Sequence, residues 1–259
     1  MAQVYTLATF LLGLAIFALL TWASPKKVGY FYLAWLAYSI SLGTHPFVLA
    51  LLPGIVYFVT ATDVKIVSIR NLLICLGLTA LGVLQYLYIP LRASAMPLYS
   101  EIKSGNLRDF WIYMTYYPKA DTLKYGLAEI IGQRIPVAAQ WWQEQFFLPG
   151  ILIGLAGAFL MARRSLRMAI FIVLVLSGNA AMYLNHGSSN IFVYPVVSYM
   201  FYTIFIAEAF SSLRLRTGIH PRLRGALSIL VLCLLLAFPA ALDVRNHPLV
   251  DQSENGLDD

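Results

Sequence analysis

The chain has 259 residues, of which 60% are hydrophobic and 12% are charged, and its formal net charge is +6. Charged residues make up about 25% of a typical soluble domain, so this composition excludes an ordinary soluble globular protein. A basic excess can indicate a nucleic-acid partner, but here it lies in short loops beside apolar runs, where it sets membrane orientation. We therefore predict membrane lipids, and no nucleic acid, as partners.

Eight apolar runs have the length, or nearly the length, of the roughly 20 residues that a membrane-spanning helix needs. They cover residues 4–23, 28–42, 46–61, 71–90, 147–162, 168–185, 191–210 and 225–242. Only Gly43-Thr44-His45-Pro46 separates the second run from the third, so these two predict either two short helices or one re-entrant hairpin. The sequence predicts an all-α, polytopic transmembrane bundle of about eight spans over residues 1–242.

Every second connection between these runs is basic, and together these connections contain a single acid, Asp63. They are Ser24–Lys27, Asp63–Arg70, Arg163–Arg167 and Arg214–Arg224. The positive-inside rule makes these loops cytoplasmic. The first run has no basic residue before it, so we expect no cleavable signal peptide and an exterior N-terminus. Eight spans then make the acidic tail, residues 243–259, exterior as well.

Residues 91–146 form the one long connection, which we expect to lie outside the membrane. Asn106 can cap a helix, with Asp109 three residues later. The helix that follows would present an apolar face made of Leu107, Phe110, Trp111 and Met114. A second amphipathic helix is predicted after Pro118 and a third from Pro136. We interpret all three as helices in the membrane interface; the alternative is a simple belt of aromatic residues.

Small residues and cysteines in the apolar runs indicate where helices pack closely against one another. Gly150, Gly154 and Gly157 have the spacing with which membrane helices approach closely. Cys75 and Cys233 both fall inside apolar runs, so we expect them to act as small packing residues.

Polar side chains of the spans gather toward the exterior end. Polar groups are costly in hydrocarbon and usually face a cavity or the inside of a bundle. Together with an arginine, whose planar fork suits phosphate, they predict a site for an anionic lipid headgroup. We take as candidate substrate-binding residues Arg92, His45, Tyr88, Asn179 and Tyr194. In the alternative interpretations Arg92 only reaches the interface, His45 only caps a helix and Asn179 only joins two helices.

No familiar catalytic or cofactor motif occurs in the chain. It has no phosphate-binding loop, no zinc-spaced His/Glu pair, no haem-attachment motif and no nucleophile elbow. We expect no cofactor, and a divalent metal only if a partner chain supplies carboxylates.

Five short motifs, in this order, nevertheless resemble a known family. They are Ala2–Leu7, Leu42-Gly43-Thr44-His45 leading to Leu51-Leu52-Pro53, Tyr88–Ala93, Phe192–Pro195 and Asn246–Ser253. The series resembles bacterial multi-span proteins related to protein O-mannosyltransferases, within the C-type glycosyltransferase superfamily. The resemblance implies a bacterial inner-membrane protein that uses a polyprenyl-phosphate-linked sugar on the exterior side, with Arg92 and His45 near the phosphate or the sugar.

The chain also departs from that family. Gln3 stands where the family tends to have Glu, and Ala8 where it tends to have Asn. The family's acidic first exterior loop, whose carboxylate activates the acceptor, has no counterpart here, nor has its C-terminal soluble domain. We therefore expect a glycosyltransferase-like module that is incomplete as a catalyst unless another membrane protein chain supplies that loop. The alternative is a non-catalytic assembly subunit of a larger membrane complex; a lipid transporter is a weaker third hypothesis.

Overall fold

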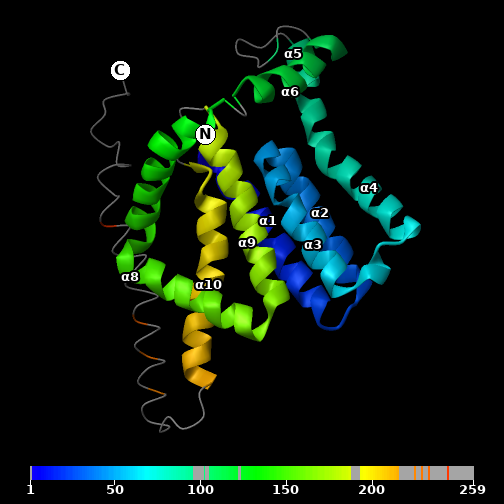
Figure 1. The fold of residues 1–259 in the computed structure, drawn as a ribbon. Helices are drawn as coiled ribbons and strands as arrows, with labels where there is room; N and C mark the ends of the chain where they lie inside the picture. The colour runs from blue at the N-terminus through cyan, green and yellow to red at the C-terminus, as the bar shows by residue number, and fades with distance from the viewer. Residues whose placement is uncertain are drawn as a thin grey trace. The chain divides into compact units, whose positions relative to one another are not determined.

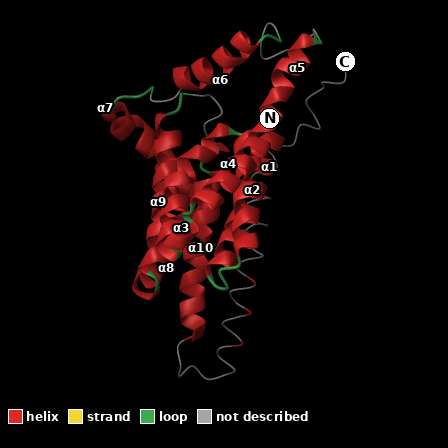
Figure 2. Ribbon diagram, turned by 90° about the vertical axis from the view of Figure 1, so that its right-hand side faces the viewer, coloured by secondary structure: helices red, strands yellow, loops and turns green. Residues whose placement is uncertain are grey.

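The computed structural model describes residues 2–95, 102, 105–121, 124–187 and 193–215, and the single residues 225, 229, 233 and 244. Within these residues the secondary structure is helical and no strand occurs (Figure 2). The chain forms two compact units. Unit 1 comprises Met1–Trp141 and Ala162–Tyr202, and unit 2 comprises Trp142–Met161 and Thr203–Asp259.

The helical elements follow one another along the chain as labelled in Figure 1. They are α1 (Ala2–Ala23), α2 (Val28–Thr44), the 3₁₀ helix η1 (Pro46–Leu51), α3 (Leu52–Thr62), the 3₁₀ helix η2 (Val64–Ile66), α4 (Ile69–Val83), the 3₁₀ helix η3 (Leu84–Leu87), α5 (Tyr88–Ser94), α6 (Leu107–Asp121), α7 (Leu127–Glu129), the π-helix η4 (Ile130–Arg134), α8 (Ile135–Arg164), α9 (Leu166–Asn185) and α10 (Val196–Leu215).

Among the described residues, four helical stretches are long and apolar enough to cross a membrane. They are Thr6–Ala23, Ile69–Ser94, Leu127–Arg164 and Leu166–Asn185, and two shorter apolar helices cover Pro46–Thr62 and Val196–Ser212. The protein is therefore all-α with candidate membrane spans, as its composition predicts. Each predicted run up to residue 210 lies on a helix, although the last of these helices begins only at Val196. The predicted run 225–242 falls outside the described residues, apart from three single positions.

The predicted helix starts in the long connection agree only in part with the structure. The Asn106 cap is confirmed, since its Oδ1 accepts a hydrogen bond from the Asp109 amide at 2.8 Å. Pro118 itself lies inside α6, and the helix predicted after it begins, within the described residues, at Leu127. The helix predicted from Pro136 corresponds to α8, which begins at Ile135, although η4 leads into it without a gap.

Unit 1 has an aromatic and glycine-lined core between α3, α9 and α10. Phe171 of α9 lies between Phe58 and Phe201, with ring centroids 4.7 Å and 5.8 Å away. A Cβ on Gly54 would meet the Val175 side chain, so α3 and α9 pack at a distance that only glycine permits. This close approach aligns α3 with α9 and fixes where their ends lie.

Helices α2 and α4 meet along a polar seam, where a glycine again permits a close approach. A Cβ on Gly82 would collide with the backbone of Ser39. Beside this contact the Trp35 indole N–H donates to the Cys75 carbonyl and to the Thr79 hydroxyl, both at 2.9 Å. Each such bond contributes about 0.6–2 kcal/mol between membrane helices. The seam therefore sets the register of the two helices.

Hydrogen bonds also join the two ends of this seam. At one end the Tyr32 hydroxyl donates to Asn71 Oδ1 at 2.6 Å. At the other end Gln85 Nε2 donates to the Ile40 carbonyl and the Tyr86 hydroxyl donates to the Leu42 carbonyl, each at 2.9 Å. These bonds hold the last turns of α4 and η3 against the end of α2, directly before His45.

Unit 2 shows the close packing that the small-residue spacing predicts. A Cβ on Gly157 of α8 would collide with the Phe205 carbonyl of α10. Helix α8 itself is broken at Phe147, whose φ of 52° and ψ of 169° are not helical. For the two cysteines, the predicted packing role fits Cys75, which is buried, but not Cys233, which is exposed.

Candidate binding site at the polar end of unit 1

The direction of the helices in unit 1 separates two ends of the molecule. Helices α2, α4 and α9 all start beside basic loops, and α2 and α9 end at His45 and His186 (Figure 1). We call these the basic end and the polar end. At 1.5 Å per residue, helices of this length hold the two ends about 25–30 Å apart. The predicted site residue His45, which follows the last residue of α2, therefore lies at the polar end.

His45 forms the corner between α2 and η1. Because Pro46 follows it, His45 adopts the extended conformation, with φ −155° and ψ 129°. Its Nδ1 accepts a hydrogen bond from the Phe47 amide at 3.2 Å, which caps η1. An imidazole nitrogen that accepts carries no proton, so the neutral ring holds its proton on Nε2. The predicted capping role of His45 is thus confirmed.

The surroundings of His45 favour its neutral form. Burial, and secondly the charge of the nearby His186, lowers the pKa of His45 from 6.5 to about 4. At neutral pH the ring is therefore uncharged, and it can donate a hydrogen bond from Nε2 without adding a buried charge.

Tyr194 joins His45 to His186. Its ring lies edge-on to the His45 ring, with centroids 5.5 Å apart, and 5.2 Å from the His186 ring. The Tyr194 hydroxyl lies 3.4 Å from Nε2 of His186. His186 and Tyr194 are both buried, whereas His45 is half-buried. We call His45, His186 and Tyr194 the polar cluster.

An arginine from a distant segment holds the chain at His186. Arg134 Nη2 donates to the carbonyls of Tyr183 and His186, each at 3.1 Å, and Nε donates to Leu184 at 3.4 Å. These carbonyls end α9 and have no partner inside the helix. A positive charge also suits the negative end of a helix. Arg134 is therefore a cap that fixes the backbone of the polar cluster.

Residues before Arg134 complete this attachment. The Arg134 guanidinium lies 4.8 Å from the centroid of the Tyr125 ring. The Tyr125 amide donates to Asn185 Oδ1, and the Lys124 amide donates to the Asn185 carbonyl, each at 3.1 Å. We call Lys124–Arg134 the α9 latch. It ties the end of the long connection to the polar end.

Asn179 lies apart from this cluster, deep in α9. It is fully buried, and its Oδ1 accepts a hydrogen bond of 2.7 Å from the Ser198 hydroxyl of α10. Its Nδ2 has no hydrogen-bond partner. Asn179 thus joins two helices, which is the structural alternative that the sequence left open.

Tyr88 and Arg92 follow the α2–α4 seam on α5 and are exposed. Gln85 and Tyr86, just before them, are bonded to the end of α2, so α5 starts at the polar end. The structure records no hydrogen bond or ring contact from the side chain of either residue to the polar cluster within the described residues. Of the five predicted site residues, it therefore brings only His45 and Tyr194 into contact.

Two residues of this region escape prediction from the sequence, His186 and Arg134. His186 follows the apolar run of α9 and precedes Gly187, a pattern that marks a helix end and offers a local signal. Arg134 has no such signal, because its partners lie about fifty residues further along the chain.

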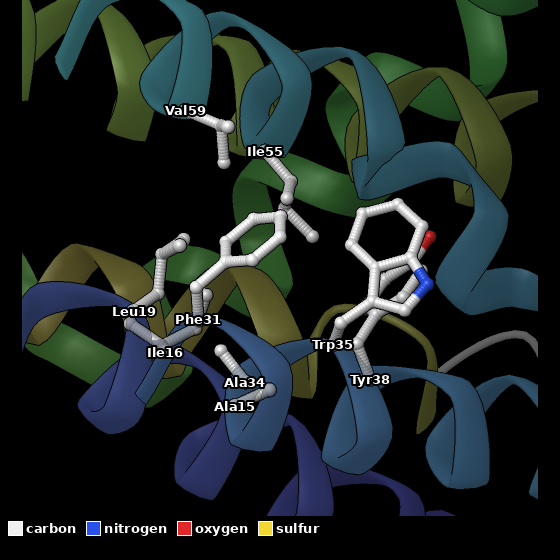
Figure 3. Close-up of a pocket in the computed structure, with 9 residues that line it drawn as sticks. All are labelled: Ala15, Ile16, Leu19, Phe31, Ala34, Trp35, Tyr38, Ile55 and Val59. Atoms are coloured by element: carbon white, nitrogen blue, oxygen red, sulfur yellow. The ribbon is translucent and has the colours of Figure 1, made fainter. Parts of the chain in front are cut away.

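An apolar crevice lies between α1, α2 and α3. Figure 3 shows the side chains around it, which are those of Ala15, Ile16, Leu19, Phe31, Ala34, Trp35, Tyr38, Ile55 and Val59. The polar atoms of Trp35 and Tyr38 are bonded elsewhere, since the Tyr38 hydroxyl donates to the Val48 carbonyl at 3.0 Å. The crevice therefore offers only hydrocarbon contacts.

The polar end has the chemistry of a binding site more than that of a metal centre. Within the described part of the chain, no three residues among His, Cys, Asp and Glu gather where they could hold a metal ion. The neutral His45 imidazole and the Tyr194 phenol can exchange hydrogen bonds with hydroxyl groups, and their rings can pack against a sugar.

Comparisons of the chain with protein-family models, with curated proteins and with solved structures find no match. The function must therefore be argued from the residues and their geometry.

Proposed function

We propose that the protein is an integral membrane module that binds a lipid-linked sugar, of the polyprenyl-phosphate class, at its polar end. The observation that carries the proposal is the gathering of His45, His186 and Tyr194 at the ends of apolar helices. This arrangement would present hydrogen-bonding groups at the depth of a lipid headgroup, where a sugar bound to membrane-embedded lipid would lie.

Arg92 supplies the charge in this proposal. It is exposed on α5, which starts at the same end as the polar cluster. A guanidinium can bind phosphate through two parallel hydrogen bonds. Arg134 is unsuited to this role, because it already caps the end of α9. Tyr88, one turn before Arg92, is exposed on the same short helix.

The proposal has a definite topology. The chain crosses a bacterial inner membrane about eight times, with the basic end cytoplasmic and both termini exterior. Helix α6 lies in the outer interface, in keeping with its exposed Leu107 and Trp111. No carboxylate lies in the polar cluster, so a general base for transfer would come from another membrane chain. The module binds the sugar but does not transfer it alone.

The test measures retention of a synthetic polyprenyl-phosphate sugar by the purified full chain, using native mass spectrometry. Arg92→Ala should weaken binding about 10- to 100-fold, the range expected for a hydrogen bond to a charged group. Tyr194→Phe keeps the ring and should weaken binding about fivefold, the loss of a neutral hydrogen bond. Arg108→Ala, which removes an exposed arginine of α6 outside the polar cluster, is the matched control and should leave binding unchanged.

A non-catalytic assembly subunit is the second candidate, and helix exposure favours it. In the 18-residue apolar stretch of Ile69–Ser94, only 11% of the residues are buried. This is the smallest share among the four long helical stretches. Its exposed leucines, which include Leu72, Leu76 and Leu81, offer a face for another membrane chain. If the wild-type chain retains no lipid-linked sugar, or if Arg108→Ala weakens retention as much as Arg92→Ala, this second function stands and the first is abandoned.

A further inference from the structure

The basic end of unit 1 exposes seven cationic side chains in three turns. They are Lys26, Lys27, Lys65, Arg70, Arg163, Arg164 and Arg167. Asp63 is the one acid in these turns, and its Oδ1 accepts a hydrogen bond from the Lys65 amide at 3.1 Å. The carboxylate thus caps η2, and the seven cations give this end a strong positive charge.

Hydrogen bonds bring two of these turns side by side. The Tyr32 hydroxyl, near the start of α2, donates to Asn71 Oδ1 at 2.6 Å. The side-chain Nδ2 of Asn71 in turn donates to the Ile66 carbonyl at 2.8 Å. The turn that holds Lys26 and Lys27 is therefore joined to the turn that holds Lys65 and Arg70.

The third turn is attached through Arg167. Its Nη1 donates to the Ala61 carbonyl at 3.4 Å, and its guanidinium lies 5.7 Å from the centroid of the Phe58 ring. The start of α9 therefore lies beside Ala61, which is near the end of α3 and two residues before Asp63. The three turns form one basic face across the ends of α1, α2, α3, α4 and α9.

Apolar side chains stand exposed among these cations. Val64 is 68% exposed and Ile69 is 74% exposed, and Val67 and Leu166 also project from the same turns. In water such residues would lose the stabilisation that burial gives. At the boundary between lipid headgroups and acyl chains, they would enter the hydrocarbon while the cations meet phosphate.

We propose that this basic face binds the phosphate groups of anionic lipids. The occupant is a lipid surface because the turns lie within a few residues of candidate membrane spans, and because cations alternate there with exposed aliphatic groups. A nucleic acid would satisfy the cations but leave Val64, Val67 and Ile69 uncovered. The proposal concerns the end opposite to the polar cluster and does not depend on the function assigned there.

The experiment uses the purified full chain in a neutral detergent, titrated with phosphatidylglycerol and separately with phosphatidylcholine. Native mass spectrometry counts the lipids that the protein retains. We expect phosphatidylglycerol to bind more tightly, and raised ionic strength to weaken its binding. Equal affinity for the charged and the uncharged lipid overturns the proposal.

Two matched variants locate the binding surface. Each cation at an anionic surface contributes a factor of about five in affinity, so Lys65→Gln should weaken phosphatidylglycerol binding about fivefold. Removing one charge from each turn, with Lys26→Gln, Lys65→Gln and Arg164→Gln together, should weaken it about 100-fold. Arg108→Gln removes one exposed charge from α6 instead and should change binding less than about twofold. An Arg108→Gln effect as large as that of Lys65→Gln overturns the proposal.

Two competitors test the nature of the ligand. Excess inorganic phosphate should not displace the lipid, because it lacks the acyl chains that Val64 and Ile69 would contact. Full displacement would reveal a site for free anions. A short DNA duplex should bind weakly, and tight binding that Lys65→Gln abolishes would assign the face to nucleic acid. Either of these results overturns the lipid assignment.

Discussion

The Tyr194 ring stands edge-on to the His45 imidazole, with a centroid separation of 5.5 Å, although 149 residues separate the two in the chain. Phe47 also contacts Tyr194, with ring centroids 5.7 Å apart. The corner after α2 and the turn before α10 therefore meet at the polar end. A ligand bound to His45 would also lie close to Tyr194. Ligand binding should therefore change the surroundings of both side chains together.

Acid should destabilise the protein through His45. Its pKa is about 4 in the folded chain and 6.5 as the reference value, so below pH 6.5 the unfolded chain binds more protons. The contribution of neutral His45 to stability is fully present above pH 6.5 and is lost as the pH drops toward 4. The loss is at most about 3 kcal/mol, because the ring is half-buried.

Thermal unfolding at a fixed heating rate, followed by circular dichroism between pH 7.5 and pH 4, measures this loss. His45→Asn is the informative variant, because Asn still caps η1 but does not titrate. Its unfolding midpoint should fall less with acid than that of the wild type. Parallel pH curves for the two proteins would show that another group is responsible.

Arg134→Gln should destabilise the α9 latch. It removes three hydrogen bonds from a charged group to the last carbonyls of α9, together with the contact on the Tyr125 ring. We expect a loss of about 2–3 kcal/mol in unfolding free energy, measured by denaturant titration in detergent. Arg134→Lys keeps the positive charge but loses the planar guanidinium. Its unfolding free energy should therefore lie between those of the wild type and Arg134→Gln.

Hydrogen exchange distinguishes this local effect from general unfolding. In Arg134→Gln the amides of Lys124 and Tyr125, which donate to Asn185, should exchange faster than in the wild type. Amides of the α2–α4 seam should keep their protection. If both regions lose protection equally, Arg134 does not act as a local cap.

Two glycines of α4 should respond in opposite ways to alanine. A Cβ on Gly82 collides with Ser39 of α2, whereas a Cβ on Gly77 has no neighbour within 4 Å. Gly82→Ala should therefore cost about 1–3 kcal/mol, the range for overpacking. Gly77→Ala should be neutral or stabilise the helix by up to about 1 kcal/mol. The measurement is the unfolding midpoint of each variant under the same conditions. Equal effects of the two substitutions would contradict the close packing of α4 against α2 at Gly82.

Lys26→Gly should raise stability. Lys26 has a φ of 52°, a left-handed conformation that costs an L-residue about 1 kcal/mol and costs glycine nothing. Its amide donates to the Trp22 carbonyl, which closes the end of α1 and which glycine retains. The unfolding midpoint in neutral detergent should rise, while retention of phosphatidylglycerol should fall with the lost charge. A fall in both would indicate that the Lys26 side chain stabilises the fold.

The sequence predicts those parts of the fold that depend on neighbouring residues. Apolar runs locate the helices because each span must be apolar over its own length, and the Asn106 cap forms within three residues. Pro118 lies inside α6, so the proline alone does not mark the end of that helix. Contacts between distant segments are not readable in this way. Arg134 meets the end of α9 only in the folded chain, so no local pattern reveals it.

The position of one predicted site residue, His45, follows from the local backbone. Pro46 makes His45 a corner, and the apolar runs make that corner the end of a helix. Nothing in the sequence predicts that Tyr194 packs on His45 or that His186 joins them. Asn179 shows the opposite case, in which the side chain is buried in α9 and bonded to Ser198, away from the described contacts of the cluster.

The polar seam constrains the order in which this chain can be assembled. Tyr32 and Trp35 emerge early in synthesis, but their hydrogen-bond partners Asn71 and Thr79 are about forty residues further on. Until α4 has been made, α2 must keep these donors satisfied by headgroups, water or an assembly factor. A chain halted before Ile69 would leave this face of α2 without α4 to bind its donors. At that point in translation the nascent protein therefore most needs protection.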